Sequence, residues 1–124
     1  MKKLFISCPM KGRTEENIRD SMERMHKIAE STFGEELELI PSYIEHTPPV
    51  DCKQDVWHLG ESIKLMAEAD YFIGVGCVWA FTDCYLEYKV AHEYGIPYVN
   101  VDMRYVMPDA WEIYEQYLIE NGLK

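Results

Sequence analysis

Residues 71–75, Tyr-Phe-Ile-Gly-Val, form a run without a single charged side chain. A strand buried on both faces, as in the centre of a parallel sheet, requires such a run, whereas a half-exposed strand alternates apolar and polar residues. Other, mainly apolar runs occur at residues 2–7, 37–40 and 97–101, and amphipathic stretches separate them. This alternation predicts an α/β sandwich built on a mainly parallel sheet.

Four amphipathic stretches supply the expected helices. The first begins after Thr14, whose hydroxyl can cap a helix, and ends at Gly34. Its apolar residues recur every three or four positions, at Ile18, Met22, Met25, Ala29 and Phe33. The second helix should bury Val56, Leu59, Ile63 and Met66, and the third Leu86, Val90 and Tyr94. The last begins at Pro108 and Asp109 and carries Trp111, Tyr114, Tyr117 and Leu118.

Two connections are less regular. Residues 41–55 hold three prolines and form a loop that is long for a compact domain, a feature often linked to function. A short fifth strand can form near Val106. No repeat or linker divides the chain, so residues 1–124 are expected to form one domain.

Charge and cysteine content narrow the partners. The formal net charge is −10, which repels nucleic-acid polymers and anionic membranes but leaves room for a small ligand. No apolar run is long enough to span a bilayer or serve as a signal peptide. The four cysteines show no C-x-x-C or zinc-ligand spacing. We therefore expect free thiols, a cytoplasmic location and no metal.

Ligands of such sheets bind beyond the carboxyl ends of the strands, which points to the loops at residues 8–13, 42–55, 76–83 and 102–108. The first joins a strand to a helix N-terminus, where free N–H groups favour an anion, and it carries Lys11 and Arg13. It is neither a Walker A loop nor a G-x-G-x-x-G turn. Phosphate contact and a solvated turn both remain open for it.

The loop at residues 76–83 contains Trp79 and Phe81, large side chains that either cover a core or stack on a flat ligand. Thr82 or Asp83 is expected to cap the helix that follows. Glu87 then lies about one turn inside, where the helix dipole is expected to keep it ionised, as a nucleophile requires. The pattern leaves open whether Glu87 faces inward or lies on the helix surface.

These segments together resemble the nucleoside 2-deoxyribosyltransferase-like family. Ile6-Ser7-Cys8-Pro9-Met10-Lys11-Gly12-Arg13 is similar to its I-S-G-P-M-x-G opening, and Ala69-Asp70 before a strand is similar to its second landmark. Residues 79–87, followed by Ala91, Gly95 and Pro97, resemble the third, roughly W-x-x-S-x-G-x-x-x-E-x-x-x-A-x-x-x-G-x-P. The order and spacing of the landmarks, from residue 4 to about 101, carry the resemblance.

The resemblance implies a flavodoxin-like three-layer sandwich with a four- to five-stranded, mainly parallel sheet. It implies a nucleoside deoxyribosyltransferase or a nucleoside or nucleotide N-glycosidase that acts on nucleosides or their 5′-monophosphates. Glu87 would attack the anomeric carbon and form a covalent glycosyl ester, without a cofactor. The implied substrate-binding residues are Ser7, Cys8, Met10, Gly12, Arg13, Trp79, Thr82 and Asp83. The family completes its sites across subunits, so at least a homodimer is expected.

The chain also departs from the family pattern. Cys8 replaces a glycine, the glycine that opens the third helix is missing, and Ser62 stands near the place of an acidic residue. These departures motivate an alternative, a non-catalytic nucleotide-binding or sensing module on the same fold. A flavin-binding analogue is a third option, although the first loop lacks a hydroxyl-rich phosphate cradle. His46 or His58 could donate a proton to a leaving base.

Overall fold

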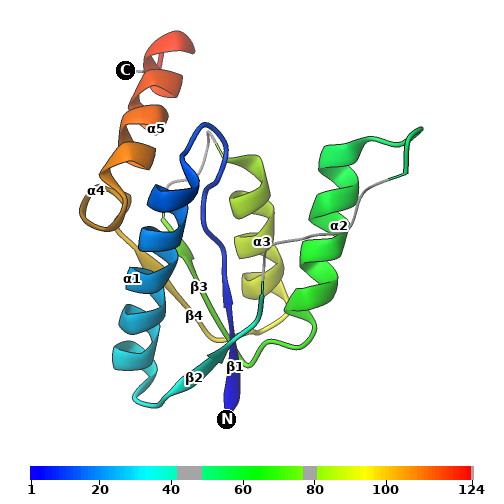
Figure 1. Ribbon diagram of the computed structural model, residues 1–124, viewed down its shortest axis with the longest axis vertical. Coiled ribbons are helices and arrows are strands. Elements are labelled where there is room, and N and C mark those ends of the chain that lie inside the picture. Colours follow the sequence, from blue (N-terminus) through cyan, green and yellow to red (C-terminus); the bar gives the residue numbers. More distant parts are fainter. Residues whose placement is uncertain (42–48, 77–80, 124) are drawn as a thin grey trace.

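The computed structural model describes residues 1–41, 49–76 and 81–123. Its four strands are β1 (Lys2–Ile6), β2 (Leu37–Leu39), β3 (Tyr71–Val75) and β4 (Tyr98–Val101). The helices are α1 (Glu15–Phe33), α2 (Gln54–Met66), α3 (Thr82–Glu93), α4 (Met103–Val106) and α5 (Pro108–Glu120). Figure 1 shows the strands side by side with helices on both faces.

All pairings within the sheet are parallel, and the strand order is β2-β1-β3-β4. This confirms the predicted α/β flavodoxin-like sandwich, with four strands in the described part of the chain. The chain moves outward from β1 to β2 and then crosses back to β3 and β4. The carboxyl ends of β1 and β3 therefore flank the point where the winding direction reverses, which is where such sheets bind ligands.

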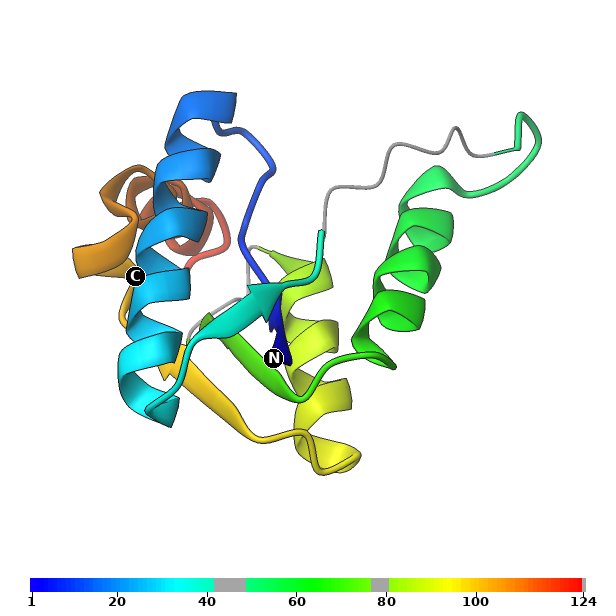
Figure 2. The same cartoon turned by 60° about the horizontal axis from the view of Figure 1, so that its bottom comes forward.

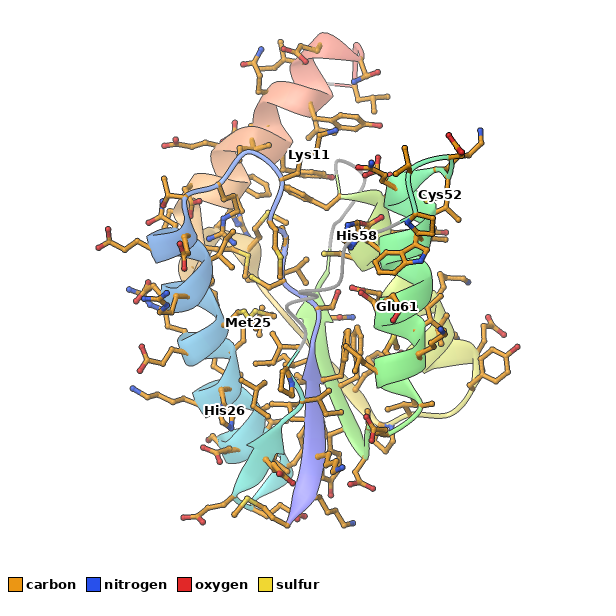
Figure 3. The ribbon with its side chains drawn as sticks, turned by 45° about the vertical axis from the view of Figure 1, so that its right-hand side comes forward. Lys11, Met25, His26, Cys52, His58 and Glu61 are labelled. Atoms are coloured by element: carbon orange, nitrogen blue, oxygen red, sulfur yellow. The ribbon has the colours of Figure 1, made fainter. Side chains whose placement is uncertain are left out.

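Helices α1, α4 and α5 cover one face of the sheet, and α2 and α3 cover the other (Figure 2). Alternation along β1 decides which residue meets which layer. Leu4 and Ile6 pack in the cluster with Met25 of α1, whereas Phe5 packs in the cluster with Met66 of α2. Figure 3 shows Met25 on the inner side of α1.

The ends of α1 follow the sequence prediction. The Thr14 hydroxyl accepts a hydrogen bond from the Asn17 amide at 3.1 Å, which satisfies one of the free N–H groups of the first turn. Gly34 ends the helix with φ of 74°, and its N–H donates to the Glu30 carbonyl. A residue with a side chain rarely adopts that conformation, which explains the glycine.

The prediction of a short fifth strand near Val106 is wrong. Residues Met103–Val106 form the short helix α4, because the Asp102 carboxylate accepts from the Arg104 amide at 3.0 Å and caps it. Among the described residues, no helix combines the length and apolar character needed to cross a membrane.

Candidate functional site

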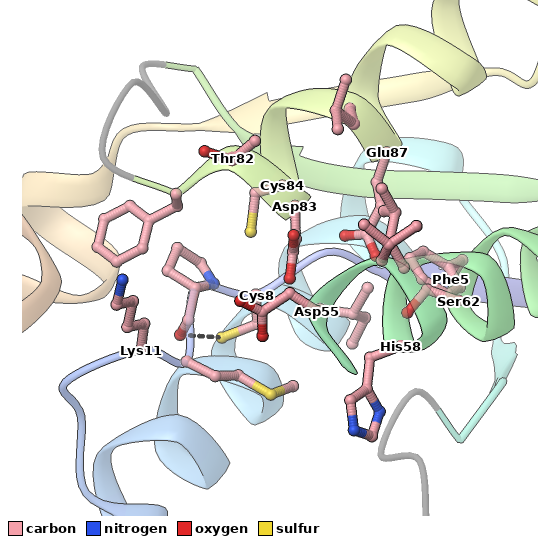
Figure 4. A pocket seen from close by; sticks show the side chains of 17 residues that line it. Phe5, Cys8, Lys11, Asp55, His58, Ser62, Thr82, Asp83, Cys84 and Glu87 are labelled. Atoms are coloured by element: carbon pink, nitrogen blue, oxygen red, sulfur yellow. Dashed lines mark hydrogen bonds between the residues drawn. The ribbon is translucent and has the colours of Figure 1, made fainter. Parts of the chain in front are cut away.

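A cavity of about 820 Å³ opens at the carboxyl end of β1, between the loop after β1, helix α2 and the beginning of α3. Its position is the ligand site that the strand order predicts. Figure 4 shows its side chains. The loop contributes residues 8–11, and α2 and the start of α3 contribute most of the rest: Asp55, Val56, His58, Leu59, Ser62, Phe81, Thr82, Asp83, Cys84, Leu86 and Glu87.

Glu87 faces inward, which settles the direction that the sequence left open. The buried residues of α3 are Cys84, Glu87 and Ala91, which follow one another at helical spacing on the face toward the sheet. Leu86 is only half-buried. Small side chains at positions 84 and 91 let the helix approach the sheet, so that the glutamate between them is 7% exposed and still borders the cavity.

Ser7 holds the Glu87 carboxylate in place. It follows β1 directly and continues the alternation of the strand, so its side chain lies on the same face as Phe5 and α3. The Ser7 hydroxyl donates a hydrogen bond to Oε1 of Glu87 at 2.7 Å, and both residues are buried. The Ser7 amide donates to the Ile73 carbonyl at 2.9 Å, which ties this serine to β3. Ser7, which the resemblance implied as a substrate-binding residue, is not among the residues that line the cavity and instead orients Glu87.

Burial raises the pKa of Glu87 from its ordinary 4.5 to about 7. Hydrogen bonds from Ser7 and Ser62 lower this pKa, and the nearby charge of Asp83 raises it further. The prediction that Glu87 is kept fully ionised is therefore wrong, because burial outweighs the two hydrogen bonds that favour the carboxylate. At neutral pH the side chain is divided between its acid and its carboxylate.

Two more carboxylates line the cavity. Asp55 enters from the first turn of α2 and Asp83 from the first turn of α3. Burial and the charge of Asp55 raise the pKa of Asp83, while His58 and Lys11 lower it. Figure 4 shows Asp55 and Asp83 between Lys11 and Glu87. The described part of the wall therefore has more acidic than basic groups.

Arg13 does not line the cavity, although the resemblance implied that it binds substrate. Its side chain is 0% exposed, and its guanidinium forms a two-armed ion pair with Asp109 of α5, at 2.7 Å and 3.0 Å. Gly12, with φ of 77°, also lies outside the lining residues and forms the turn before Arg13. These two residues shape the loop and leave Lys11 as its cation at the cavity.

The remaining implied residues divide into two groups. Cys8, Met10, Thr82 and Asp83 line the cavity with Glu87, whereas Trp79 lies outside the described residues. The prediction that Thr82 or Asp83 caps α3 is wrong. Phe81 occupies the N-cap position of α3, with no side-chain hydrogen bond, so both polar side chains are left to face the cavity.

The thiols in the wall are free and protonated at neutral pH. Cys8 and Cys84 form no disulfide. Burial raises the pKa of Cys8 to about 11 and also raises that of Cys84 well above its usual range. A nucleophilic role requires a thiolate, so the carboxylates are the better candidates for chemistry.

Sequence reasoning named His58 and Ser62 of α2 but missed Asp55 and Leu59 of the same helix. It expected Val56 and Ile63 in the core, but Val56 is 63% exposed and Met66 is the buried residue of this helix. The amino-terminal half of α2 stands away from the sheet (Figure 1), and the cavity lies beside it. Asp55 and Leu59 face this space.

Other candidates have structural partners. Asp70 accepts a hydrogen bond from the Lys3 amide at 2.8 Å, and His26 Nε2 lies 2.9 Å from the Leu37 carbonyl oxygen. His92 Nδ1 lies 3.1 Å from the Tyr98 hydroxyl. His58 lines the cavity, whereas His46 lies outside the described residues. Within the described ranges, no three His, Cys, Asp or Glu side chains come together as a metal site would require.

The chain was compared with protein-family models, curated proteins and solved structures, and none of the three comparisons gives a match. The class of protein therefore follows from the fold and the cavity alone. It is an α/β flavodoxin-like sandwich with a buried glutamate at the point where the winding direction reverses.

Proposed function

We propose that this protein cleaves or transfers the N-glycosidic bond of a nucleoside or nucleoside 5′-monophosphate, with Glu87 as the nucleophile. One observation carries the proposal. The Glu87 carboxylate is shielded from bulk water, oriented by Ser7, and borders a cavity that the loop at residues 8–11 covers. The sequence resemblance assigns the same residue this role.

The reaction would proceed in two displacements. A carboxylate oxygen of Glu87 donates an electron pair to the anomeric carbon while the carbon–nitrogen bond breaks and its electrons leave with the base, which takes up a proton. A glycosyl ester then links the sugar to Glu87. A water molecule or a second base attacks the same carbon and releases the carboxylate. Two inversions retain the anomeric configuration, as in retaining glycosidases.

The charge of the cavity wall supports this chemistry. The transition state is an oxocarbenium-like cation, which nearby carboxylates stabilise in a site partly shielded from water. Asp55 and Asp83 supply such charge beside Glu87. The raised pKa of Asp83 makes its acid form easier to reach than that of an ordinary aspartate, and we assign Asp83 or His58, which both line the cavity, to protonate the leaving base.

A non-catalytic nucleotide-binding or sensing module is the second candidate. The observation that favours it is the pKa of Glu87, because a half-protonated carboxyl is a weaker nucleophile than a fully ionised one. Such a module would bind nucleosides or nucleotides in the same cavity without turnover.

Chromatography of reactions with a panel of nucleosides and 5′-monophosphates tests the proposal directly. We expect free base from at least one compound, and no release above background from Glu87→Gln, which keeps the volume and removes the charge. Glu93→Gln is the matched control, because Glu93 lies on the same helix with an exposed side chain. Intact-mass measurement during turnover should show one added glycosyl group on the wild type and none on Glu87→Gln.

Two results would contradict the proposal, one for the role of Glu87 and the other for the reaction itself. Full activity of Glu87→Gln would exclude Glu87 as the nucleophile. Thermal stabilisation by a nucleotide without any base release, over a long incubation with and without an acceptor base, would support the binding module instead.

A further inference from the structure

The side chain of Arg13 lies beneath the loop that covers the cavity and contacts three parts of the fold. Its Nη1 donates to the Pro9 carbonyl at 2.8 Å and lies 3.5 Å from the Cys8 sulfur. Its Nη2 donates to the Ser21 hydroxyl of α1 at 2.6 Å. Its Nε and Nη2 meet the two carboxylate oxygens of Asp109 on α5. One guanidinium thus connects the loop, α1 and α5.

The charge of Arg13 is balanced inside the protein. Burial alone would lower its pKa, but the hydrogen bond to Asp109 raises the pKa above its ordinary value. The same contact lowers the pKa of Asp109, so that both groups stay ionised. A two-armed arginine–carboxylate pair fixes direction as well as distance, which a lysine cannot reproduce.

The residues that Arg13 holds are those that face the ligand space. Cys8 and Pro9 line the cavity, whereas Arg13 itself is on the other side of the loop. A backbone hydrogen bond from the Arg13 amide to the Met10 carbonyl, at 3.1 Å, closes the turn between them. The conformation of the loop above Glu87 therefore depends on a contact with α5, 96 residues away in the sequence.

We propose that Arg13 is a positioning residue, which together with Asp109 fixes the loop at residues 8–11 over the cavity and so sets the affinity for the substrate. The expected effect on substrate affinity rests on the proposed function. The expected effect on the loop conformation rests on the hydrogen bonds alone. Glu87 is held separately by Ser7, so loosening the loop should impair substrate binding more than the chemical step.

Hydrogen exchange measured by mass spectrometry tests the structural part without any substrate. In Arg13→Lys and in Asp109→Asn, exchange in a peptide covering residues 8–13 should accelerate about tenfold or more, while peptides from β3 stay protected. Arg24→Lys is the matched control, because Arg24 pairs with Asp20 on the exposed side of α1. Unchanged loop exchange in both folded variants would overturn the inference.

Steady-state kinetics with the active nucleoside tests the consequence for the site. We expect KM to rise about tenfold in both variants, with kcat changing less than about threefold, since the Ser7–Glu87 contact is intact. A fall in kcat at constant KM would contradict the positioning role. If the wild type turns over no nucleoside, the proposed function fails, and hydrogen exchange still decides whether Arg13 fixes the loop.

Discussion

The Ser7 hydroxyl and the Glu87 carboxylate meet at 2.7 Å across 80 positions of sequence, one at the end of β1 and the other on the buried face of α3. This contact stabilises the ionised form of Glu87 against burial. If the carboxylate is the nucleophile, base release should increase as pH rises through about 7, because deprotonation generates the reactive form.

Ser7→Ala removes the hydrogen bond that lowers the pKa of Glu87. We expect the rising limb of the pH–rate profile to move to higher pH by about one unit, and the rate at pH 7 to fall about fivefold, because the ionised fraction of Glu87 drops from about one half to about one tenth. Ser31→Ala, at an exposed position of α1, serves as the control. A Ser7→Ala profile that coincides with the wild type would show that this hydroxyl does not govern the ionisation of Glu87.

Glu87 should also make folding pH-dependent. Because its pKa is about 7 in the folded protein and near 4.5 when unfolded, the native state binds the extra proton between these values. Protonation of Glu87 contributes fully to the free energy of unfolding below pH 4.5. This contribution, about 3 kcal/mol, is lost as pH rises through 7. Glu87→Gln removes this titration. It should match the wild type near pH 4.5 and exceed its stability at pH 8.

Urea unfolding of both proteins at pH 4.5 and pH 8 measures that difference, and other titrating groups cancel in the comparison. Glu93→Gln, at an exposed position of the same helix, is the matched control. A stability difference for Glu87→Gln that is equal at the two pH values would contradict the raised pKa.

Local sequence patterns predicted most of the scaffold. The uncharged run at residues 71–75 forms β3. Thr14 caps the start of α1 and Gly34 its end, as expected. These features depend on neighbours within a few positions, since strand burial, capping and left-handed turns leave local signatures. The position of the cavity followed from the strand order.

The site itself depended on distant contacts. Arg13 was expected at the ligand, but its partner Asp109 lies 96 positions away, and no local pattern connects the two. The direction of Glu87 was undecided because Leu86 and Glu87 compete for the inward position. The small residues Cys84 and Ala91 allow the close approach that buries Glu87. Apolar Val56 lines the cavity and is largely exposed, because the buried residue of α2 is Met66, near the opposite end of the helix.

The cavity charge predicts a preference for uncharged ligands. The described wall places Asp55, Asp83 and Glu87 against Lys11 and His58, and Arg13 is paired elsewhere. A phosphate group carries nearly two negative charges and meets net repulsion there. We expect a nucleoside to bind more tightly than its 5′-monophosphate, measured by calorimetry with Glu87→Gln to prevent turnover.

The preference is measured as the Kd of the monophosphate divided by the Kd of the nucleoside. Asp83→Asn should lower this ratio by about tenfold, and Lys11→Gln should raise it. Added salt should also lower the ratio, because ions screen the repulsion between the phosphate and the carboxylates. Asp20→Asn, on the exposed face of α1, is the control for a change in net charge alone. Tighter binding of the monophosphate by Glu87→Gln, lost in Lys11→Gln, would show instead that Lys11 forms a phosphate site.

Two glycines should respond to alanine in opposite directions. A Cβ at Gly74 would lie 2.9 Å from Cε1 of Phe72, whose ring is fully buried, and 3.5 Å from Oδ1 of Asn100. Since the added Cβ would force this buried ring to shift, Gly74→Ala should destabilise the protein by about 1–3 kcal/mol. Gly60 lies inside α2, and an added Cβ there would meet no atom within 4 Å, so Gly60→Ala should stabilise the protein by up to about 1 kcal/mol. Urea unfolding measures both, and a stabilising Gly74→Ala would contradict the close packing of the Phe72 ring over Gly74 on β3.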